Sequence, residues 1–293
     1  MARMRRKSSF VRFSLSLLIA AQAIAAPAER VTIAGRTVYI WRPEGRTPAT
    51  GFPMVVFSHG YFTCATQSTF LMEALARAGY FVLAPNHRDS LCSGGLLSSL
   101  LTGQESFFTN SGRWSDATYK DRAADIRAIM DALPVVGWFQ GVPVDRQRIA
   151  LAGHSLGGYT ALGLAGAWPA WKDDRVKAVL VFTPYCLPFL NKGNLRNVNV
   201  PVMYQGGTQD FGVSPTIRRA NGAYDATAAP KYYVEFDGAG HFAWSDFTAK
   251  YQKITAEYSV AFLDLYLKGT DRLGPLCAKP LPKLVSLLRV DLK

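Results

Sequence analysis

The chain has 293 residues, a length that fits one large α/β domain or two smaller domains. Its composition, 49% hydrophobic and 18% charged, is that of a globular protein and excludes a disordered chain. The net charge is +12, but Lys and Arg are scattered and form no helix-turn-helix, zinc-finger or aromatic-basic pattern, which argues against nucleic-acid binding.

The first 25 residues have the pattern of a secretory signal peptide. An apolar stretch at 13–25 ends in the small residues of Ala23-Ile24-Ala25 and follows a group of cationic residues, Arg3, Arg5, Arg6, Lys7 and Arg12. A membrane anchor or a mitochondrial presequence is the alternative, but the run is too short to span a bilayer and is not interrupted by Arg. We expect an exported protein, periplasmic or secreted, whose mature chain of residues 26–293 has no stable membrane insertion.

The first part of the mature chain is predicted to contain a hairpin and two buried strands. Residues 30–41 alternate around Gly35, which suggests an edge hairpin. Residues 52–57 form a near-continuous apolar run, typical of a strand buried on both faces of a parallel sheet. A helix is expected over 66–79, followed by a second buried strand at 80–84.

Residues 90–114 interrupt this succession of strands and helices. They are rich in Ser, Gly and Leu, and their apolar residues follow neither a helical nor a strand periodicity. An irregular segment of this length in a compact domain often has a function. Two interpretations stay open: a rim or lid over the site, or a surface excursion tied down by Cys92.

The second half alternates strands and helices. A helix with an apolar stripe and a charged face, the latter with Asp121, Arg122 and Asp125, is expected over 115–133. Residues 141–147 are expected to turn the chain into the next strand. The further strands are 149–152, 176–182, 200–204 and 231–236, and the closing helix is 248–268. This alternation predicts right-handed crossovers, a mostly parallel sheet and a single α/β domain with its site beyond the carboxyl ends of the strands.

A serine lies at the centre of a glycine-lined corner, Gly153-His154-Ser155-Leu156-Gly157. The apolar strand before it and the Ala/Leu/Gly-rich helix after it are the context in which a G-x-S-x-G sequence presents a nucleophile. Gly153 and Gly157 would keep both flanks of the corner free of a Cβ. An ordinary turn is the alternative, but the strand and helix favour Ser155 as a nucleophile.

Two further residues follow predicted strands, in the order Ser, Asp, His expected of an α/β-hydrolase. His241 is the candidate general base, and Asp210 is the candidate acid that orients its imidazole. The alternative for Asp210 is a helix cap. His59 and His87 end earlier strands, where structural hydrogen bonds are the expectation.

Acyl transfer also needs hydrogen-bond donors for the oxyanion. The backbone N–H of Leu156, directly after the serine, is one candidate. The second is expected from the loop after the first central strand, with Tyr61 as the predicted donor.

Four cysteines in an exported chain favour two disulfides. Cys64 and Cys92 lie in loops after neighbouring predicted strands, so we predict the pairs Cys64–Cys92 and Cys186–Cys277. Free thiols in one or both pairs are the alternative. The wide spacing does not fit a zinc site, and no metal is predicted.

Four segments carry a family resemblance: Phe57-Ser58-His59-Gly60-Tyr61, residues 78–89, Arg122-Ala123-Ala124-Asp125-Ile126, and Gly153 to Gly158. Together they resemble the dienelactone-hydrolase-like and platelet-activating-factor acetylhydrolase-like branch of the α/β-hydrolases over roughly residues 31–268. Secreted cutinase-like polyester hydrolases look similar around Gly60-Tyr61 and in the spacing from Asp210 to His241.

The resemblance implies an α/β-hydrolase fold, a triad of Ser155, Asp210 and His241, and oxyanion donors at Tyr61 and Leu156. Tyr185 falls where related enzymes place a substrate-lining aromatic residue. One departure is that dienelactone hydrolases proper use a Cys nucleophile, which puts that substrate in doubt.

We therefore expect an exported serine hydrolase that cleaves carboxylic esters through an acyl-enzyme, with no metal or organic cofactor. An acyltransferase with the same triad and a catalytically idle binding module on a hydrolase fold are the alternatives. The sequence leaves open whether the substrate is a small ester, a lipid or a polyester, and it leaves the oligomeric state open.

Overall fold

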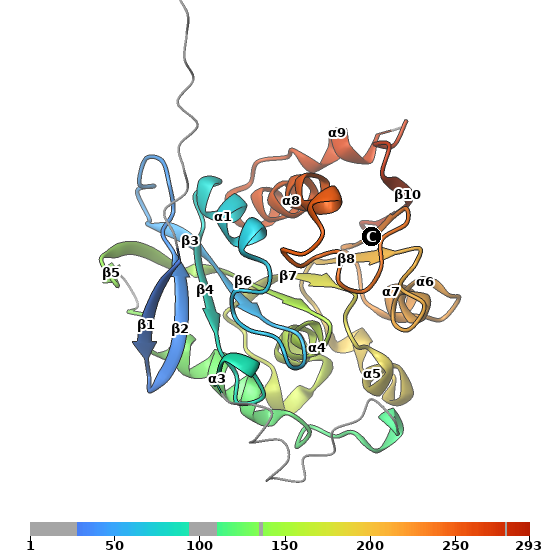
Figure 1. The fold of residues 1–293 in the computed structure, drawn as a ribbon, viewed down its shortest axis with the longest axis horizontal. Helices are drawn as coiled ribbons and strands as arrows, with labels where there is room; N and C mark the ends of the chain where they lie inside the picture. Colours follow the sequence, from blue (N-terminus) through green and yellow to red (C-terminus); the bar gives the residue numbers. More distant parts are fainter. Residues whose placement is uncertain (1–27, 94–109, 135–136, 279) are drawn as a thin grey trace, which may run out of the picture.

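A ten-stranded sheet runs through the molecule in a computed structural model that describes residues 28–93, 110–134, 137–278 and 280–293 (Figure 1). The strand order is β1-β2-β4-β3-β6-β7-β8-β9-β10, and β5 pairs with β6. The predicted signal peptide and most of the predicted rim or lid lie outside the described residues.

The six central strands are parallel, and antiparallel strands flank them. The bounds of the strands are β1 Glu29–Ile33, β2 Arg36–Trp41, β3 Phe52–Ser58, β4 Phe81–Pro85, β5 Gly137–Phe139, β6 Val142–His154, β7 Val176–Phe182, β8 Val202–Gly207, β9 Lys231–Phe236 and β10 Val285–Asp291.

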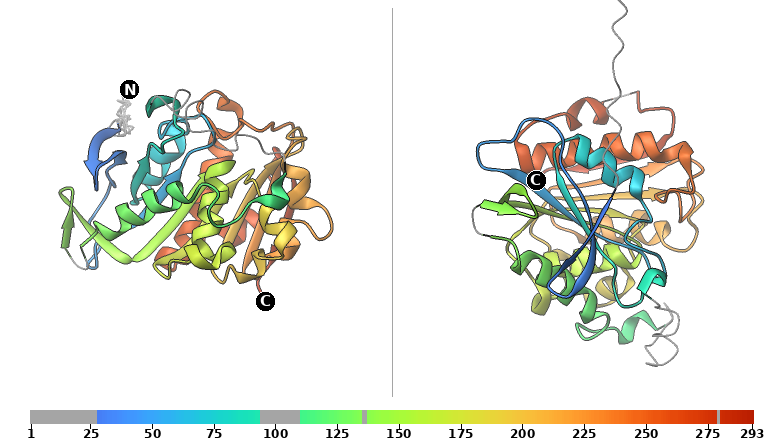
Figure 2. Two further views of the ribbon diagram at one scale, coloured as in Figure 1. Left: turned by 90° about the horizontal axis from the view of Figure 1, so that it is seen from below. Right: turned by 60° about the vertical axis from the view of Figure 1, so that its left-hand side comes forward.

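Helices cover both faces of the sheet, as expected of an α/β-hydrolase fold. Figure 2 (right) shows the cyan α1 and the orange-red α8 on one side and the green helices α3 and α4 on the other. The helices are α1 Thr69–Arg77, α3 Lys120–Asp131, α4 Leu156–Leu162, α5 Leu187–Lys192, α6 Ser214–Arg218, α7 Ala223–Ala226, α8 Ala249–Leu263 and α9 Leu273–Cys277. Single π turns, Gly163–Ala167 and Asp264–Lys268, continue α4 and α8.

The run of apolar residues in β3 reflects its position between these layers. Met54 and Val56 belong to the core on the α3 and α4 side, while Val55 and Phe57 belong to the core on the α1 and α8 side. Successive side chains of a strand point to opposite faces, so a strand covered on both faces must be apolar at every position. The predicted parallel sheet is therefore present, and its core is divided in two by the sheet.

Two strands differ from the expectation. The segment predicted as a turn at 141–147 belongs largely to β6, whose first residues pair with β5 in a hairpin. Gln140 and Gly141 have φ of 50° and 74° and make a two-residue reversal. β10 was not predicted at all, and it pairs antiparallel with β9 to form one edge of the sheet.

The cysteines give one confirmed pair and one correction. Cys64 and Cys92 form a disulfide that joins the loops after β3 and β4. The predicted pair Cys186–Cys277 is wrong, because both thiols are free. Cys186 is buried in the core on the α4 side, and Cys277 packs against the core on the α8 side, so the sheet separates them.

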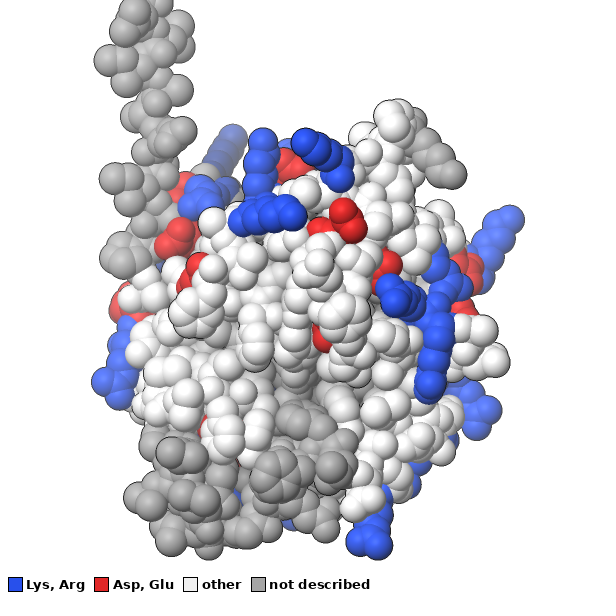
Figure 3. Space-filling model, turned by 45° about the vertical axis from the view of Figure 1, so that its right-hand side comes forward, with Lys and Arg blue, Asp and Glu red and all other residues white. Residues whose placement is uncertain are grey.

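The basic residues of the described chain are spread out on the face shown in Figure 3. On the face shown in Figure 3, Lys and Arg lie around the margin and the middle of the face is free of them. Among the described residues, none of the helices has the length and apolar character needed to cross a bilayer.

Candidate active site

Ser155 lies at the tip of the corner between β6 and α4, at the carboxyl end of the strand. Its φ is 53° and its ψ is −115°, a positive-φ conformation that is strained for a residue with a Cβ. Neighbouring backbone holds the corner in place: Ser155 N–H donates to Phe182 O at 2.9 Å, and Ser155 O accepts the N–H of Tyr185 at 3.1 Å. The side chain is thus presented from a rigid corner.

The glycines of the corner are required by close backbone approach. A Cβ on Gly153 would overlap the backbone of Gly157, and a Cβ on Gly157 would overlap the carbonyl of Ser58. The start of α4 therefore packs directly on the end of β3. This contact brings the loop after β3 close to Ser155.

Asp210 and His241 meet beyond the ends of β8 and β9. His241 Nδ1 lies 3.3 Å from Asp210 Oδ2, and the side chains are 26% and 3% exposed. A hydrogen bond of this kind leaves His241 Nε2 as the proton acceptor. The imidazole is thus accessible while its carboxylate partner is buried.

The carboxylate of Asp210 has a second set of partners. Backbone N–H groups of Val213 and Ser214 donate to it at 3.3 Å, and Ser214 Oγ donates at 3.0 Å. Burial opposes its ionisation, but the hydrogen bonds from His241 and Ser214 outweigh this and hold the pKa of Asp210 below its usual range. Asp210 thus also binds the start of the next helix, the alternative considered for it, while it contacts His241.

The loop after β3 is fixed by side chains that surround its backbone. Gly60 N–H donates to Gln67 Oε1 at 2.7 Å, and Gly60 O accepts from His59 Nδ1 at 2.7 Å and from Thr63 Oγ1 at 2.9 Å. Burial lowers the pKa of His59, which keeps its ring neutral. Tyr61, the predicted oxyanion donor, follows directly in this clamped loop.

One residue of this loop environment was assigned wrongly from the sequence. Arg122 was expected on the charged face of its helix, but it is fully buried and its guanidinium contacts Asp89, His59 O and Gly60 O. The helical spacing of Arg122 from the apolar residues of its helix indicates its burial. Arg122 lies four residues before Ile126 and seven before Ile129, which places it on the apolar stripe of α3.

A second group of serine, histidine and aspartate lies behind this loop. Ser58 Oγ is 2.9 Å from His87 Nε2, and His87 Nδ1 is 2.9 Å from Asp125 Oδ2. Ser58 and His87 are buried, and burial, followed by the charge of Arg122, lowers the pKa of His87. The expected structural role of His59 and His87 agrees with these contacts.

The segment before α1 connects the loop of Tyr61 to the loop of His241. Gln67 O accepts the N–H of Asp246 at 2.9 Å, while the Gln67 side chain binds Gly60. The carboxylate of Asp246 in turn accepts the N–H groups of Thr69 and Phe70, both at 3.0 Å. Both loops therefore rest on the beginning of the same helix.

The ring of Tyr185 is buried and lies 5.1 Å from the ring of Trp114. Its backbone N–H binds Ser155 O, as described above. A role of Tyr185 in lining the substrate stays a prediction.

An apolar groove of about 280 Å³ lies between the two loops. Its lining includes Phe62, the neighbour of Tyr61, and Phe242, the neighbour of His241. Leu91 and Phe247 also line it, and their side chains are largely exposed. The groove therefore offers apolar contact area next to the candidate catalytic residues.

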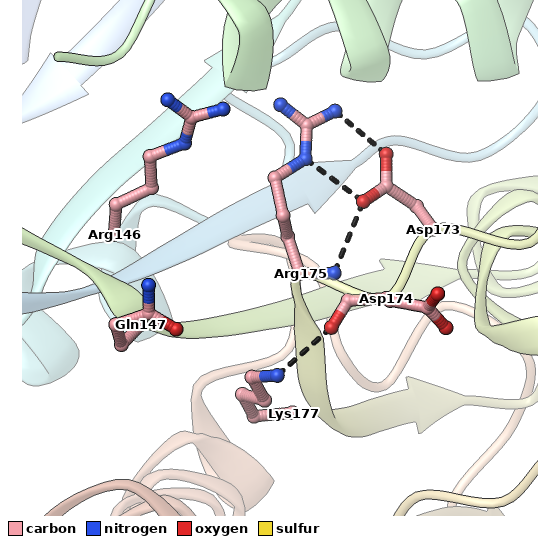
Figure 4. Close-up of a pocket in the computed structure, with 6 residues that line it drawn as sticks. All are labelled: Arg146, Gln147, Asp173, Asp174, Arg175 and Lys177. Carbon is pink, nitrogen blue, oxygen red and sulfur yellow. Dashed lines mark hydrogen bonds and ion pairs between the residues drawn. The ribbon is translucent and has the colours of Figure 1, made fainter. Parts of the chain in front are cut away.

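A larger hollow, of about 430 Å³, is formed by charged residues that include Arg146 and Lys177 (Figure 4). Arg175 is bound there to Asp173 on one side and to Asp131 on the other. Asp173 and Arg175 precede β7, so the hollow lies at the opposite end of the strand from the carboxyl end, where α/β sheets bind ligands. It contains no candidate nucleophile paired with a base.

Among the described residues, no group of three or more His, Cys, Asp or Glu side chains is arranged to hold a metal ion.

Comparison with known proteins finds two family matches. The profile of the PET hydrolase-like family matches residues 122–286, and that of the X-Pro dipeptidyl-peptidase (S15) family matches residues 37–181. The first match covers more than half of the chain and includes the segments that carry Ser155, Asp210 and His241.

Individual relatives are cutinases from Thermobifida. Cutinase est1 of Thermobifida alba is 32% identical over 255 residues, which cover 86% of this chain and 72% of the relative. Cutinase 2 of Thermobifida cellulosilytica and cutinase cut1 of Thermobifida fusca are each 35% identical over 131 residues, 44% of this chain. Those two matches span 45% and 37% of the relatives' own lengths.

Proposed function

The chain belongs to the PET hydrolase-like family of α/β-hydrolases, and from this premise we propose that it is an exported serine hydrolase that cleaves carboxylic esters. The acyl group would be carried by Ser155, His241 would act as the base, and Asp210 would orient the histidine. The backbone N–H groups of Tyr61 and Leu156 would bind the oxyanion.

One observation carries the proposal. A serine in a strained corner lies at the same end of the sheet as a partly exposed histidine whose Nδ1 contacts a buried carboxylate at 3.3 Å. A turn with no chemical task does not need a strained nucleophile next to such a pair. The arrangement suits acyl transfer because it supplies a nucleophile, a base and a fixed negative charge behind the base.

The proposed reaction has two halves. Ser155 Oγ attacks the ester carbonyl while its proton passes to His241 Nε2, and the imidazolium then protonates the departing alcohol. Water, deprotonated by His241, attacks the acyl-enzyme in the same way and releases the acid. The negative charge on the carbonyl oxygen in both tetrahedral intermediates would be bound by the two backbone N–H groups.

Replacement of the nucleophile tests the proposal. Ser155→Ala is expected to lower kcat for a p-nitrophenyl ester by about 10⁶-fold, which leaves the effect of binding and of the oxyanion donors. A fluorophosphonate probe should label the wild-type protein at Ser155 and should leave the variant unlabelled. Normal turnover by Ser155→Ala would refute the mechanism, and unlabelled wild-type protein without esterase activity would favour an idle binding module.

An acyltransferase would use the same residues, so the acceptor has to be tested separately. We expect the acyl-enzyme to be consumed by water, with little ester exchange when a short alcohol is added at millimolar concentration. Preferential transfer to the alcohol would favour the acyltransferase.

We propose further that the substrate is an apolar ester, including a polyester. The named relatives are cutinases and the family is called PET hydrolase-like, and the groove beside the site is lined by Phe62, Phe242 and Phe247. Esters graded by acyl length, together with a polyester film, would test this. Faster hydrolysis of longer acyl chains and release of soluble products from the film are expected, and a strict preference for acetyl esters would contradict the proposal.

Export is the remaining part of the proposal. The cationic residues before an apolar stretch and the disulfide Cys64–Cys92, a bond typical of oxidising compartments, support it. Expression of the full chain followed by N-terminal sequencing should find a mature protein that begins after Ala25. An uncleaved protein retained in the cytoplasm would refute the signal peptide.

A further inference from the structure

Arg122 is a buried charge whose hydrogen bonds are directed at the loop of Tyr61. On one side, its Nε and Nη2 donate to Asp89 Oδ1 and Oδ2 at 3.1 and 2.6 Å. On the other side, Nη1 donates to His59 O at 2.6 Å and Nη2 to Gly60 O at 3.2 Å. The guanidinium is therefore neutralised by a carboxylate and bridges two successive backbone carbonyls.

Stability alone gives little reason for this arrangement. A buried ion pair repays its desolvation only when its geometry is very good, and replacement by apolar residues of similar size is often neutral or stabilising. The pair Arg122–Asp89 is 0% and 3% exposed, so its desolvation is complete. A task other than stability is a better explanation for its place in the core.

The peptide geometry shows what the guanidinium fixes. In a trans peptide the C=O and the following N–H point in opposite directions. With His59 O and Gly60 O held toward Arg122, the N–H groups of Gly60 and Tyr61 must face the other way. Gln67 Oε1 accepts the N–H of Gly60. The N–H of Tyr61 is the predicted oxyanion donor.

The same stretch of backbone contacts the corner that carries the serine. Gly157 packs on the carbonyls of Ser58 and His59 so closely that a Cβ there would overlap Ser58 O. The position of the Tyr61 peptide relative to Ser155 therefore depends on the contact with α4 as well as on the contact with Arg122.

We propose that Arg122, held by Asp89, is a positioning residue that orients the Gly60–Tyr61 peptide for oxyanion binding. This inference rests on the proposed ester hydrolysis. Arg122 does not touch the substrate and acts only through the direction of the Tyr61 N–H. His59 Nδ1 and Thr63 Oγ1 also bind Gly60 O, so the loop keeps part of its support when the guanidinium is lost.

The main test is Arg122→Lys, which keeps the charge but cannot bridge both carbonyls and the carboxylate. A misplaced oxyanion donor is expected to lower kcat by about 10²-fold, since removal of such a donor costs 10²–10³-fold. KM should change by less than about threefold, because the ground-state ester does not need the donor. The matched control is Arg127→Lys on the same helix, which donates a hydrogen bond to Ala170 O and should keep wild-type kcat.

Two measurements separate positioning from misfolding. Titration with a fluorophosphonate counts the competent sites, and kcat is divided by that count. Affinity for a boronic acid, which mimics the tetrahedral intermediate, should fall in Arg122→Lys by about the same factor as kcat. Wild-type kcat per competent site, or an unchanged boronic acid affinity beside a reduced kcat, would overturn the inference.

A second variant tests the inference in case Arg122→Lys does not fold. The double substitution Arg122→Met with Asp89→Leu replaces the ion pair by apolar side chains and is expected to melt near the wild-type temperature with kcat still about 10²-fold lower. Wild-type kcat in that variant would overturn the inference as well. An inactive wild-type protein, or an active Ser155→Ala variant, would instead refute the proposed function. These outcomes differ from those that would overturn only the role of Arg122.

Discussion

The structure contains two groups of serine, histidine and aspartate whose serines and histidines end or follow strands, and the two groups differ in backbone conformation and in solvent access. Ser155 lies in a strained corner, and the His241 side chain beyond it is 26% exposed. Ser58 ends the regular strand β3, and His87 is 0% exposed with a lowered pKa. The second group has the contacts of a triad, but its base is sealed and hard to protonate. Residue types and contacts are therefore not sufficient, because a base must also be reachable and able to accept a proton.

In this comparison, the largest effect expected after the loss of Ser155 itself comes from the carboxylate that holds His241. Asp210→Asn should lower kcat by about 10⁴-fold, because the amide favours the wrong tautomer of His241 while the shape of the site is kept. Steady-state kinetics on a soluble ester measures this. A loss of less than tenfold would mean that Asp210 only supports the following helix.

The matching change in the sealed group should affect folding and not chemistry. Asp125→Asn removes the carboxylate shared by His87 and Arg36 and is expected to lower the free energy of unfolding by about 2 kcal/mol, because the buried ring of His87 loses its hydrogen bond to a charged group. Urea unfolding measures this, and kcat per competent site should stay within threefold of wild type. A fall of kcat comparable to that of Asp210→Asn would show that the two groups are coupled.

Acid should destabilise the fold through the buried histidines. Burial lowers the pKa of His154 to about 3, and the nearby charge of His241 adds to this, whereas the unfolded chain titrates near 6.5. Between these values the unfolded state binds more protons, so stability falls as the pH falls. From pH 7 to pH 5, His154 alone should cost about 2 kcal/mol.

Denaturant unfolding at the two pH values checks this expectation. His154→Gln is the control because glutamine does not titrate, and its loss between pH 7 and pH 5 should be smaller by about the same amount. An equal loss in both proteins would mean that folding does not lower the pKa of His154.

The smallest effect is expected for Ser58→Ala. The hydroxyl contacts His87 Nε2, and its removal should cost about 1 kcal/mol of unfolding free energy through a lost buried hydrogen bond. The ester hydrolysis rate should be unchanged. Reduced labelling by a fluorophosphonate in this variant would show that the sealed serine is reactive after all.

The sequence predicted those parts of the fold that depend on local pattern. The central strands were found because burial on both faces makes them nearly continuous apolar runs, as in β3 and β7. The strand ends then indicated which loops hold Ser155, Asp210 and His241, and the structure brings the last two into contact. Their catalytic roles remain a proposal.

The remaining features depend on contacts between distant segments. β10 is only partly buried and lacks a strong apolar run, so its pairing with β9 was not visible. Cys186 and Cys277 are not bonded to each other because they lie on opposite faces of the sheet. Their distance along the sequence does not show which face each one occupies. The burial of Arg122 depends on its hydrogen bonds to carbonyls of a loop more than sixty residues earlier in the chain.

The shared support at the start of α1 has a consequence for heat inactivation. Gln67 binds Gly60 in one loop and Asp246 in the other, so both loops depend on one short piece of backbone. Regions that share their hydrogen bonds tend to open as one cooperative unit. On warming, the candidate oxyanion donor and the candidate base should lose their order together, at a temperature below that at which the central sheet melts. Activity would then disappear in a single step while most of the fold is still intact.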